Sequence, residues 1–393
     1  MPLSDKAATN ILRLLDTEEE RNSLLAFRLL NSQGAAGDFL LSLCGHFLVA
    51  EGEQRLALRR CLRPLLRMAA RERGCTPEQK DGLMWLLNYD PTREKAKPER
   101  FLLILEDALG LDILALSRFL FSRSGQSAQL LLRRGTPADR DALLAIRCYD
   151  GPRGRTLDLS RLGLARLPEE AGQYKDVEAL NLRHNELEAT DVFFLERFRK
   201  LRFLDLRFNR MARIPDGLPL LPRLQEADLR MGSLQVPLFD YLRHPLREII
   251  LVNLRMEPGF PLSQFNNEDV ACILKNWTYE AGSRLVLNLA GKGFRSVPDA
   301  IRRFPRLAYV DLRDNPISFL PPWFLRMPAL REVYCDRGVE YNYSYLRPGL
   351  AVYRENEQEP PAPQEQAAPW MANLAAFPAE LPVAIPLEGL GGR

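Results

Sequence analysis

Two cysteines stand close to side chains that can activate a thiol, and they are the first candidates for chemistry in this sequence. Cys44 lies two residues before His46, and Cys335 is followed directly by Asp336. A thiol beside a base is the arrangement of a cysteine nucleophile. Cys44, however, lies in a strongly apolar helical segment without a third polar member nearby, which is typical of core packing. We therefore expect Cys44 to be structural.

The common sequence signatures of catalysis are absent from the chain. It contains no GxxxxGK[ST], GxGxxG, HExxH or GxSxG pattern, the patterns that serve phosphate, dinucleotide, zinc and acyl chemistry. The six cysteines have no CxxC spacing, and the three histidines are far apart in sequence, which argues against a disulfide framework or a zinc knot. We expect no enzyme activity, no cofactor and no bound metal.

A sequence motif with two core leucines two positions apart recurs from Leu157 onward. Its copies follow one another at a near-constant period, and only the interval from Ile249 to Leu287 is longer. Residues two apart point to the same side of a strand, and stacked copies bury an apolar edge that one copy cannot bury alone. The first apolar position of each copy is occupied by Leu157, Leu180, Leu204, Ala227, Ile249, Leu287, Val310 and Val333.

These repeats resemble the leucine-rich-repeat family, in its 23-residue class with a Leu-Pro return segment, which is common in bacterial cytosolic proteins. The resemblance covers about residues 155–340. It implies an α/β solenoid with parallel strands on a concave face, and protein binding through that face. Asn185, Asn209 and Asn315 suit a ladder of side-chain amides that bind backbone groups of the turns. Four copies depart from this pattern, with Leu162, Gly232, Leu254 and Lys292 at the asparagine position.

The long interval predicts a helical insertion near residues 259–283. Val270, Ile273 and Leu274 have helical spacing and indicate a short helix from about Asn266 to Trp277. An insertion of this kind is either part of a binding face or a tolerated excursion from the solenoid. The sequence leaves both interpretations open.

The chain is predicted to have three parts. Residues 1–150 show the periodicity of successive amphipathic helices, including segments at 54–72, 77–88, 99–122 and 137–147, and predict an all-helical domain that caps the solenoid. The solenoid is predicted to span 151–345 with about eight repeats. The spaced prolines of 353–393 predict a flexible tail. Within it a short apolar set is either a linear motif or folds back on the last repeat: Trp370, Met371, Leu374 and Phe377.

The outward positions of the predicted strands form a column of acidic residues beside a column of arginines. One hypothesis is that these charges only pair across strands, which contributes ~0–1 kcal/mol per pair. The other is that arginines and aromatic residues form a protein-binding surface. The predicted contact residues are Arg183, His184, Asp205, Arg207, Phe208, Asp228, Arg230, Met231, Asp311, Arg313 and Tyr334.

Charge and hydropathy limit the kind of partner. The net charge of +3 is small, and a balanced aspartate column opposes phosphate contacts, so we expect no nucleic acid. The N-terminus has no secretory signal, and the apolar stretch 101–121 carries four charged residues, so we expect a cytoplasmic protein without a membrane span. The sequence does not fix the oligomeric state.

The leading interpretation is a non-enzymatic scaffold or interaction module that binds a protein partner through the concave repeat face. The alternative is a secreted bacterial effector that acts on host ubiquitin or GTPase signalling. Effector ubiquitin ligases join such repeats to a cysteine-nucleophile domain. Cys335 occupies a core position of the last repeat, and only the stretch 336–393 follows it. We therefore expect no such domain after Cys335.

Overall fold

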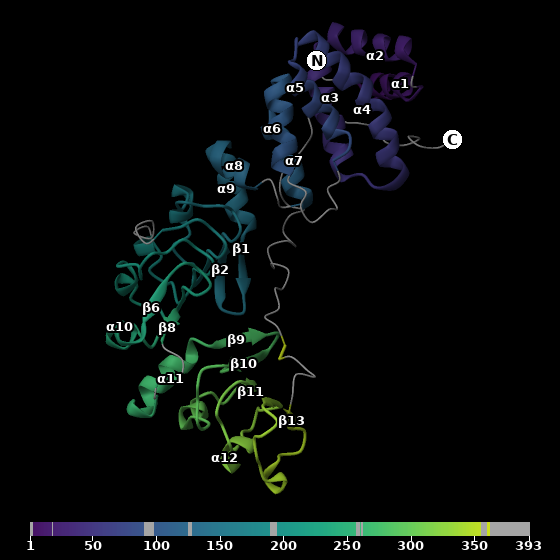
Figure 1. The fold of residues 1–393 in the computed structure, drawn as a ribbon. Coiled ribbons are helices and arrows are strands. Elements are labelled where there is room, and N and C mark those ends of the chain that lie inside the picture. Colours follow the sequence, from purple (N-terminus) through teal and green to yellow (C-terminus); the bar gives the residue numbers. More distant parts are fainter. Residues whose placement is uncertain are drawn as a thin grey trace. The chain divides into compact units, whose positions relative to one another are not determined.

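The computed structural model describes residues 3–17, 19–89, 98–124, 128–188, 195–256, 260, 262–354 and 360–361. These residues group into two compact units that divide between Tyr149 and Asp150, with Pro168–Ala171 grouped with the first unit. The first unit is helical, and the second holds the repeat strands (Figure 1). Capping of the solenoid by the helical unit stays a prediction.

The helices of the first unit carry clear start and stop signals. Thr76 and Thr136 each cap a helix, with a hydroxyl that accepts the backbone N–H three residues on and a proline directly after. Gly110, at φ +60°, separates two helices within the predicted segment 99–122. The apolar faces of the described helices meet in one core, except for that of the last helix, whose buried residues are not part of this core. These helices are α1 (Asp5–Asp16), α2 (Glu20–Ser32), α3 (Ala36–Val49), α4 (Gly52–Glu72), α5 (Pro77–Leu86), α6 (Pro98–Leu109), α7 (Ile113–Ser124), α8 (Ala128–Arg134) and α9 (Pro137–Ile146).

The second unit begins with a sheet whose repeat strands run parallel. Its order is β1 (Cys148–Gly151), β2 (Gly154–Asp158), β3 (Ala179–Asn181), β4 (Phe203–Asp205), β5 (Glu226–Asp228) and β7 (Ile250–Leu251). Strand structure thus begins inside the range predicted to be all helical. Each strand from β2 onward pairs in parallel with the next one in this order, as the repeat pattern predicts.

The pairing of the strands shows that the repeat register predicted from the sequence was wrong at one repeat. Ile250, not Ile249, pairs with Ala227, and Leu251 pairs with Asp228. A slip of one residue moves a side chain to the other face of a sheet, so the outward position belongs to Leu251. The buried column consists of Leu157, Leu180, Leu204, Ala227 and Ile250.

The predicted asparagine ladder is confirmed. Asn185 Nδ2 donates to the carbonyls of Leu159 and Leu182 at 2.8 and 2.9 Å. Its Oδ1 accepts the backbone N–H groups of Leu162 and Leu164 at 3.1 and 3.0 Å. One buried amide therefore satisfies four backbone groups of two repeats. Equivalent bonds are made by Asn209 and Asn315.

The insertion near 259–283 contains more than the predicted helix. Helix α11 (Asn267–Lys275) follows its N-cap Asn266, and an antiparallel hairpin of β9 (Thr278–Ala281) and β10 (Arg284–Asn288) comes next. The same order of helix and hairpin occurs at α9, β1 and β2. These three elements start at positions 137, 148 and 154, and their later counterparts start at 267, 278 and 284, so the offset is constant. The second unit therefore contains two repeat arrays, each of which follows a helix and a hairpin.

The second array forms its own sheet, in the order β13, β12, β11, β10, β9. Its last strand, β13, pairs in parallel with β12 through Arg354, which extends the solenoid beyond the predicted end at 345. The apolar tail residues Trp370, Met371, Leu374 and Phe377 lie outside the described residues. The remaining elements are β6 (Gln235–Pro237), β8 (Asn253–Arg255), β11 (Leu307–Asp311), β12 (Glu332–Cys335), β13 (Ala351–Arg354), α10 (Leu238–Arg243) and α12 (Pro322–Leu325).

Candidate functional site

We call the face of each sheet opposite the leucine core its open face. On this face an aspartate forms an ion pair with the arginine two positions later in the same repeat. Arg207 Nε and Nη2 donate to the two carboxylate oxygens of Asp205 at 3.0 and 2.6 Å. Asp205 Oδ1 also accepts the backbone N–H of Arg207 at 3.1 Å. The hydrogen bond to Asp205 raises the pKa of Arg207 above its ordinary value, so this guanidinium stays charged. The same three bonds join Asp228 to Arg230 and Asp311 to Arg313.

Arg230 connects the two repeat arrays inside the second unit. Its side chain is only 11% exposed, and that of Asp228 is 10% exposed. Arg230 Nη1 donates to the carbonyl of Asn276 at 3.1 Å and also to the carbonyl of Thr278. These two carbonyls lie where α11 gives way to β9. The guanidinium thus ties β5 of the first array to the start of the second.

Three more of the predicted contact residues are largely buried in the second sheet. Asp311 is 1% exposed and Tyr334 is 2% exposed. The guanidinium of Arg313 lies 5.9 Å from the centre of the Tyr334 ring, and burial raises the pKa of the Tyr334 phenol. The structure therefore places these residues inside the second array and apart from the first-sheet residues.

One repeated backbone position, three residues after a strand ends, is occupied by His184, Phe208 and Met231. Their φ angles are 56°, 56° and 63°, in the left-handed region that costs a residue with a side chain about 1–2 kcal/mol. Each backbone N–H is used there: His184 and Phe208 donate to the next repeat's carbonyls at 2.9 and 3.2 Å. Met231 donates to Asn253 Oδ1 at 3.0 Å. The same conformation occurs at Arg161, Gly291 and Asp314.

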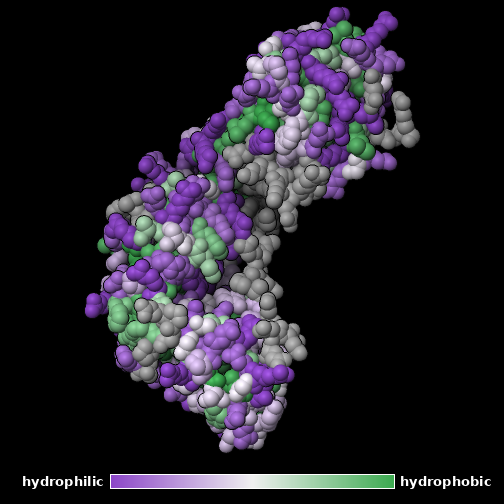
Figure 2. All heavy atoms as spheres, viewed as in Figure 1, coloured by the Kyte–Doolittle hydropathy of each residue, from purple (hydrophilic) through white to green (hydrophobic). Residues whose placement is uncertain are grey.

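These three residues form what we name the turn patch. The rings of His184 and Phe208 stack with centroids 4.1 Å apart and planes 7° from parallel. Phe208 is 42% exposed and Met231 is 57% exposed. Arg183 and Arg207, both half-buried, directly precede His184 and Phe208 in sequence. Apolar side chains elsewhere form small patches among polar ones in the view of Figure 2.

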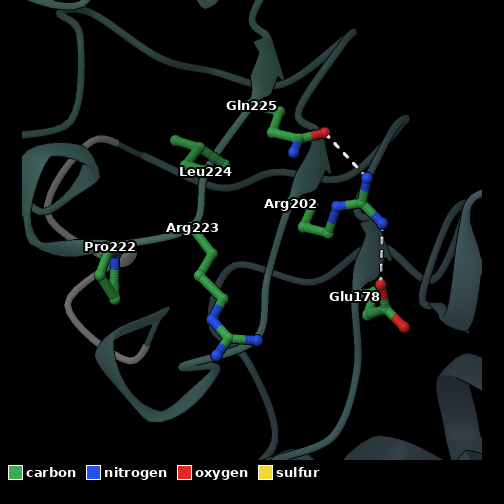
Figure 3. Close-up of a pocket in the computed structure, with 6 residues that line it drawn as sticks. All are labelled: Glu178, Arg202, Pro222, Arg223, Leu224 and Gln225. Atoms are coloured by element: carbon green, nitrogen blue, oxygen red, sulfur yellow. Dashed lines mark hydrogen bonds and ion pairs between the residues drawn. The ribbon is translucent and has the colours of Figure 1, made fainter.

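A polar hollow at the other end of the strands was missed by the sequence analysis. Arg202 donates to Glu178 Oε2 and to Gln225 Oε1, both at 3.1 Å (Figure 3). These three residues lie two positions before the core leucine column in successive repeats, a signal that the sequence contains. Pro222, Arg223 and Leu224 complete its lining. In this hollow Glu178 balances the charge of Arg202.

The structure shows no activated thiol at either candidate cysteine. Cys44 is fully buried, and burial raises the pKa of its thiol, which disfavours the reactive thiolate. His46 packs edge to face against Phe119, with ring centroids 5.7 Å apart. Burial raises the pKa of Cys335 to about 11. Neither thiol has the lowered pKa of a nucleophile.

Two further searches cover only the described residues. They contain no group of three or more His, Cys, Asp or Glu side chains placed to hold a metal ion. Every helix in this part of the chain is too short or too polar to cross a membrane.

The repeated strands, the buried leucine columns and the asparagine bonds define a leucine-rich-repeat solenoid, which follows a helical unit in the chain. No family model matches the chain. Among curated proteins it is similar to Tsukushi of Xenopus tropicalis, with 28% identity over 166 residues, 41% of this chain and 44% of that protein. The chain thus spans less than half the length of this relative.

Solved structures give weaker similarities. An internalin of Listeria monocytogenes has 12% identity and a TM-score of 0.34, over 52% of this chain and 61% of that chain. A leucine-rich-repeat protein of Leptospira interrogans has 19% identity and a TM-score of 0.31, over 61% of this chain and 62% of that chain. Scores of this size add nothing to the fold assignment, which rests on the register and the asparagine bonds.

Proposed function

We propose that the protein is a non-enzymatic interaction module that binds a protein partner through the turn patch and the adjacent arginines of the first open face. The exposure of Phe208 and Met231 carries this proposal. Both side chains sit on left-handed backbone, where glycine would avoid the strain and the exposed apolar surface. Strained residues of this kind concentrate at ligand-binding positions.

The proposed contact set is smaller than the eleven residues predicted from sequence. Arg230 and Asp228 join the two arrays, and Asp311, Arg313 and Tyr334 lie in the second sheet. The set that stays is Arg183, His184, Asp205, Arg207, Phe208 and Met231. Aromatic, methionine and arginine side chains are the residues enriched at protein interfaces. A partner that places an apolar side chain beside a carboxylate would complement this set.

A capture experiment with matched variants tests the proposal. The tagged chain is incubated with lysate of the source organism, and captured proteins are quantified by mass spectrometry. The double variant Phe208→Ala/Met231→Ala should lose the specific partner, because two anchors at about 2 kcal/mol each reduce affinity roughly several hundredfold, for a total of about 4 kcal/mol. Arg183→Glu should weaken capture as well.

Leu220→Ala/Phe239→Ala is the control, since these residues are 59% and 52% exposed outside the turn patch. The control should retain the partner. If the two double variants capture the same proteins in the same amounts, the turn patch is not the binding site.

The proposed location is the cytoplasm. All six cysteines are free thiols in the structure, which supports a reducing compartment. Mass spectrometry of alkylated protein from cells would check this, because oxidised cysteine pairs would contradict it.

A further inference from the structure

The open face of the second sheet differs from that of the first because it carries an apolar cluster beside the Asp311–Arg313 pair. Val286 pairs with Tyr309 across β10 and β11, and Tyr334 on β12 pairs with Asp311 on β11. These residues cluster with Ala281 and Ala308, and Tyr279 and Tyr353 pack against them. The cluster lies on the side opposite the core residues Leu287 and Val310. A solvent-facing sheet surface normally carries polar side chains, so this one requires a cover.

Tyrosine supplies most of this surface. Seven of the eleven tyrosines in the chain lie between residues 279 and 353. Tyr334 and Tyr353 stack with centroids 5.3 Å apart, and the guanidinium of Arg284 lies 5.5 Å from the Tyr309 ring centre. The second open face therefore combines aromatic faces, phenol groups and positive charge. We name Tyr279, Tyr309, Tyr334 and Tyr353 the tyrosine face.

A segment from beyond the last strand contacts this surface. Tyr279 Oη donates a hydrogen bond to the carbonyl of Pro361 at 3.1 Å, across 82 residues of sequence. Pro360 and Pro361 are half-buried. Arg354 ends β13 at one edge of the sheet, whereas Tyr279 belongs to β9 at the other edge. Strands β13 and β9 are thus four spacings of about 4.8 Å apart, or about 19 Å in all.

The chemistry of this contact suits proline. Proline has no backbone N–H and a fixed φ, so an extended proline-rich segment presents ring faces and carbonyl acceptors. Aromatic side chains that also donate a hydrogen bond are the usual partners of such segments. The sequence around the contact, EPPAPQE, has three prolines in four residues and glutamates on both sides. These glutamates are complementary in charge to Arg284.

We propose that the tyrosine face is a binding site for extended proline-rich segments, and that the Pro360–Pro361 segment of this chain occupies it. A proline-rich segment of another protein would then have to displace the segment already in place. This site is separate from the turn patch, so neither proposal depends on the other. The tethered segment acts at an effective concentration of about 1 mM or more, and only a stronger or more abundant ligand displaces it.

Peptide binding to the full chain tests this proposal. The probe is a fluorescent peptide with the sequence of residues 355–365, measured by anisotropy against wild type and Pro360→Ala/Pro361→Ala. The variant should bind the peptide about tenfold more tightly than wild type, because its own segment no longer competes. A peptide with all three prolines replaced by alanine should bind weakly to both proteins.

The variant Tyr279→Phe, added to the proline variant, should lower peptide affinity about fivefold, since it removes one hydrogen bond worth about 1 kcal/mol. Tyr345→Phe in the same background is the matched control and should leave affinity unchanged. The substitution at Tyr279 keeps the ring and the packing, so the fold is preserved. Equal peptide binding by wild type and the proline variant, no binding to either, or no preference for the proline peptide would overturn the proposal.

Discussion

Arg230 Nη1 lies 3.1 Å from the carbonyl oxygen of Asn276, 46 residues further along the chain. The carboxylate of Asp228 holds the guanidinium through two bonds of 2.9 and 2.6 Å. Its remaining donor group therefore points at the carbonyls between α11 and β9. One of the predicted contact residues thus connects the two repeat arrays.

This contact predicts that Arg230→Ala lowers the free energy of unfolding by about 2–4 kcal/mol. The substitution removes the closest partner of the mostly buried Asp228 carboxylate and the donor to the carbonyls of Asn276 and Thr278. Arg207→Ala is the matched change, since Arg207 makes the same bonds to Asp205 but is 31% exposed. It should cost less than about 1 kcal/mol. Urea unfolding of both variants measures the difference, and equal costs would show that the contact with Asn276 contributes nothing.

The asparagine ladder predicts a large effect from a small change. Asn185→Ala removes the partner of four backbone groups in the buried turn and should cost about 3 kcal/mol or more. Glu186→Ala, at the exposed neighbouring position, should change stability by less than about 0.5 kcal/mol. Chemical denaturation decides the comparison. A cost near that of the control would mean that water replaces the amide.

Asp139 predicts a pH dependence in acid. Its hydrogen bond from Arg118, 2.6 Å long, lowers the pKa of Asp139 to about 2. A lowered carboxyl pKa stabilises the folded state above the unfolded pKa of about 3.9, and this gain is lost as the pH falls toward 2. The stability difference between wild type and Asp139→Asn should reach about 2 kcal/mol at pH 6 and shrink between pH 4 and 2.

Thermal unfolding between pH 2 and pH 6 measures this difference. The exposed carboxylate of Asp81 provides the control, and Asp81→Asn should follow wild type over the whole range. A constant offset of Asp139→Asn at every pH would mean that the loss comes from packing and not from the ionised pair.

We expect the cysteine thiols to react slowly with thiol reagents, and in a definite order. Burial raises the pKa of Cys44, Cys272 and Cys335, so all three are mostly protonated at pH 8. Cys272 is the least buried cysteine and should react first with a thiol reagent in the native protein. Cys44→Ala and Cys335→Ala should each cost about 0.5–3 kcal/mol and leave partner capture unchanged. Lost capture at an unchanged melting temperature would support a nucleophile instead.

The sequence by itself determined the repeat fold, because the fold depends on local periodicity. Leucines two apart, a near-constant repeat period and Asn185, Asn209 and Asn315 fix which side chains turn inward and which turns need an amide. The helix that follows the N-cap Asn266 was predictable for the same reason, since an N-cap acts within one turn. At Ile249 and Ile250 two similar residues adjoin, and only strand pairing decided which one faces the core.

Only the tertiary structure decided which of the outward-facing side chains stay accessible to solvent. Periodicity places Arg207 and Arg230 in equivalent positions, yet only Arg230 meets the carbonyls of a later hairpin. The contact of Tyr279 with Pro361 likewise joins residues 82 apart. A repeat pattern specifies the direction of a side chain within its own repeat. Which residues cover that side chain depends on where distant segments of the chain pack. Contacts between distant segments have no periodic pattern in the sequence, so the repeats do not predict them.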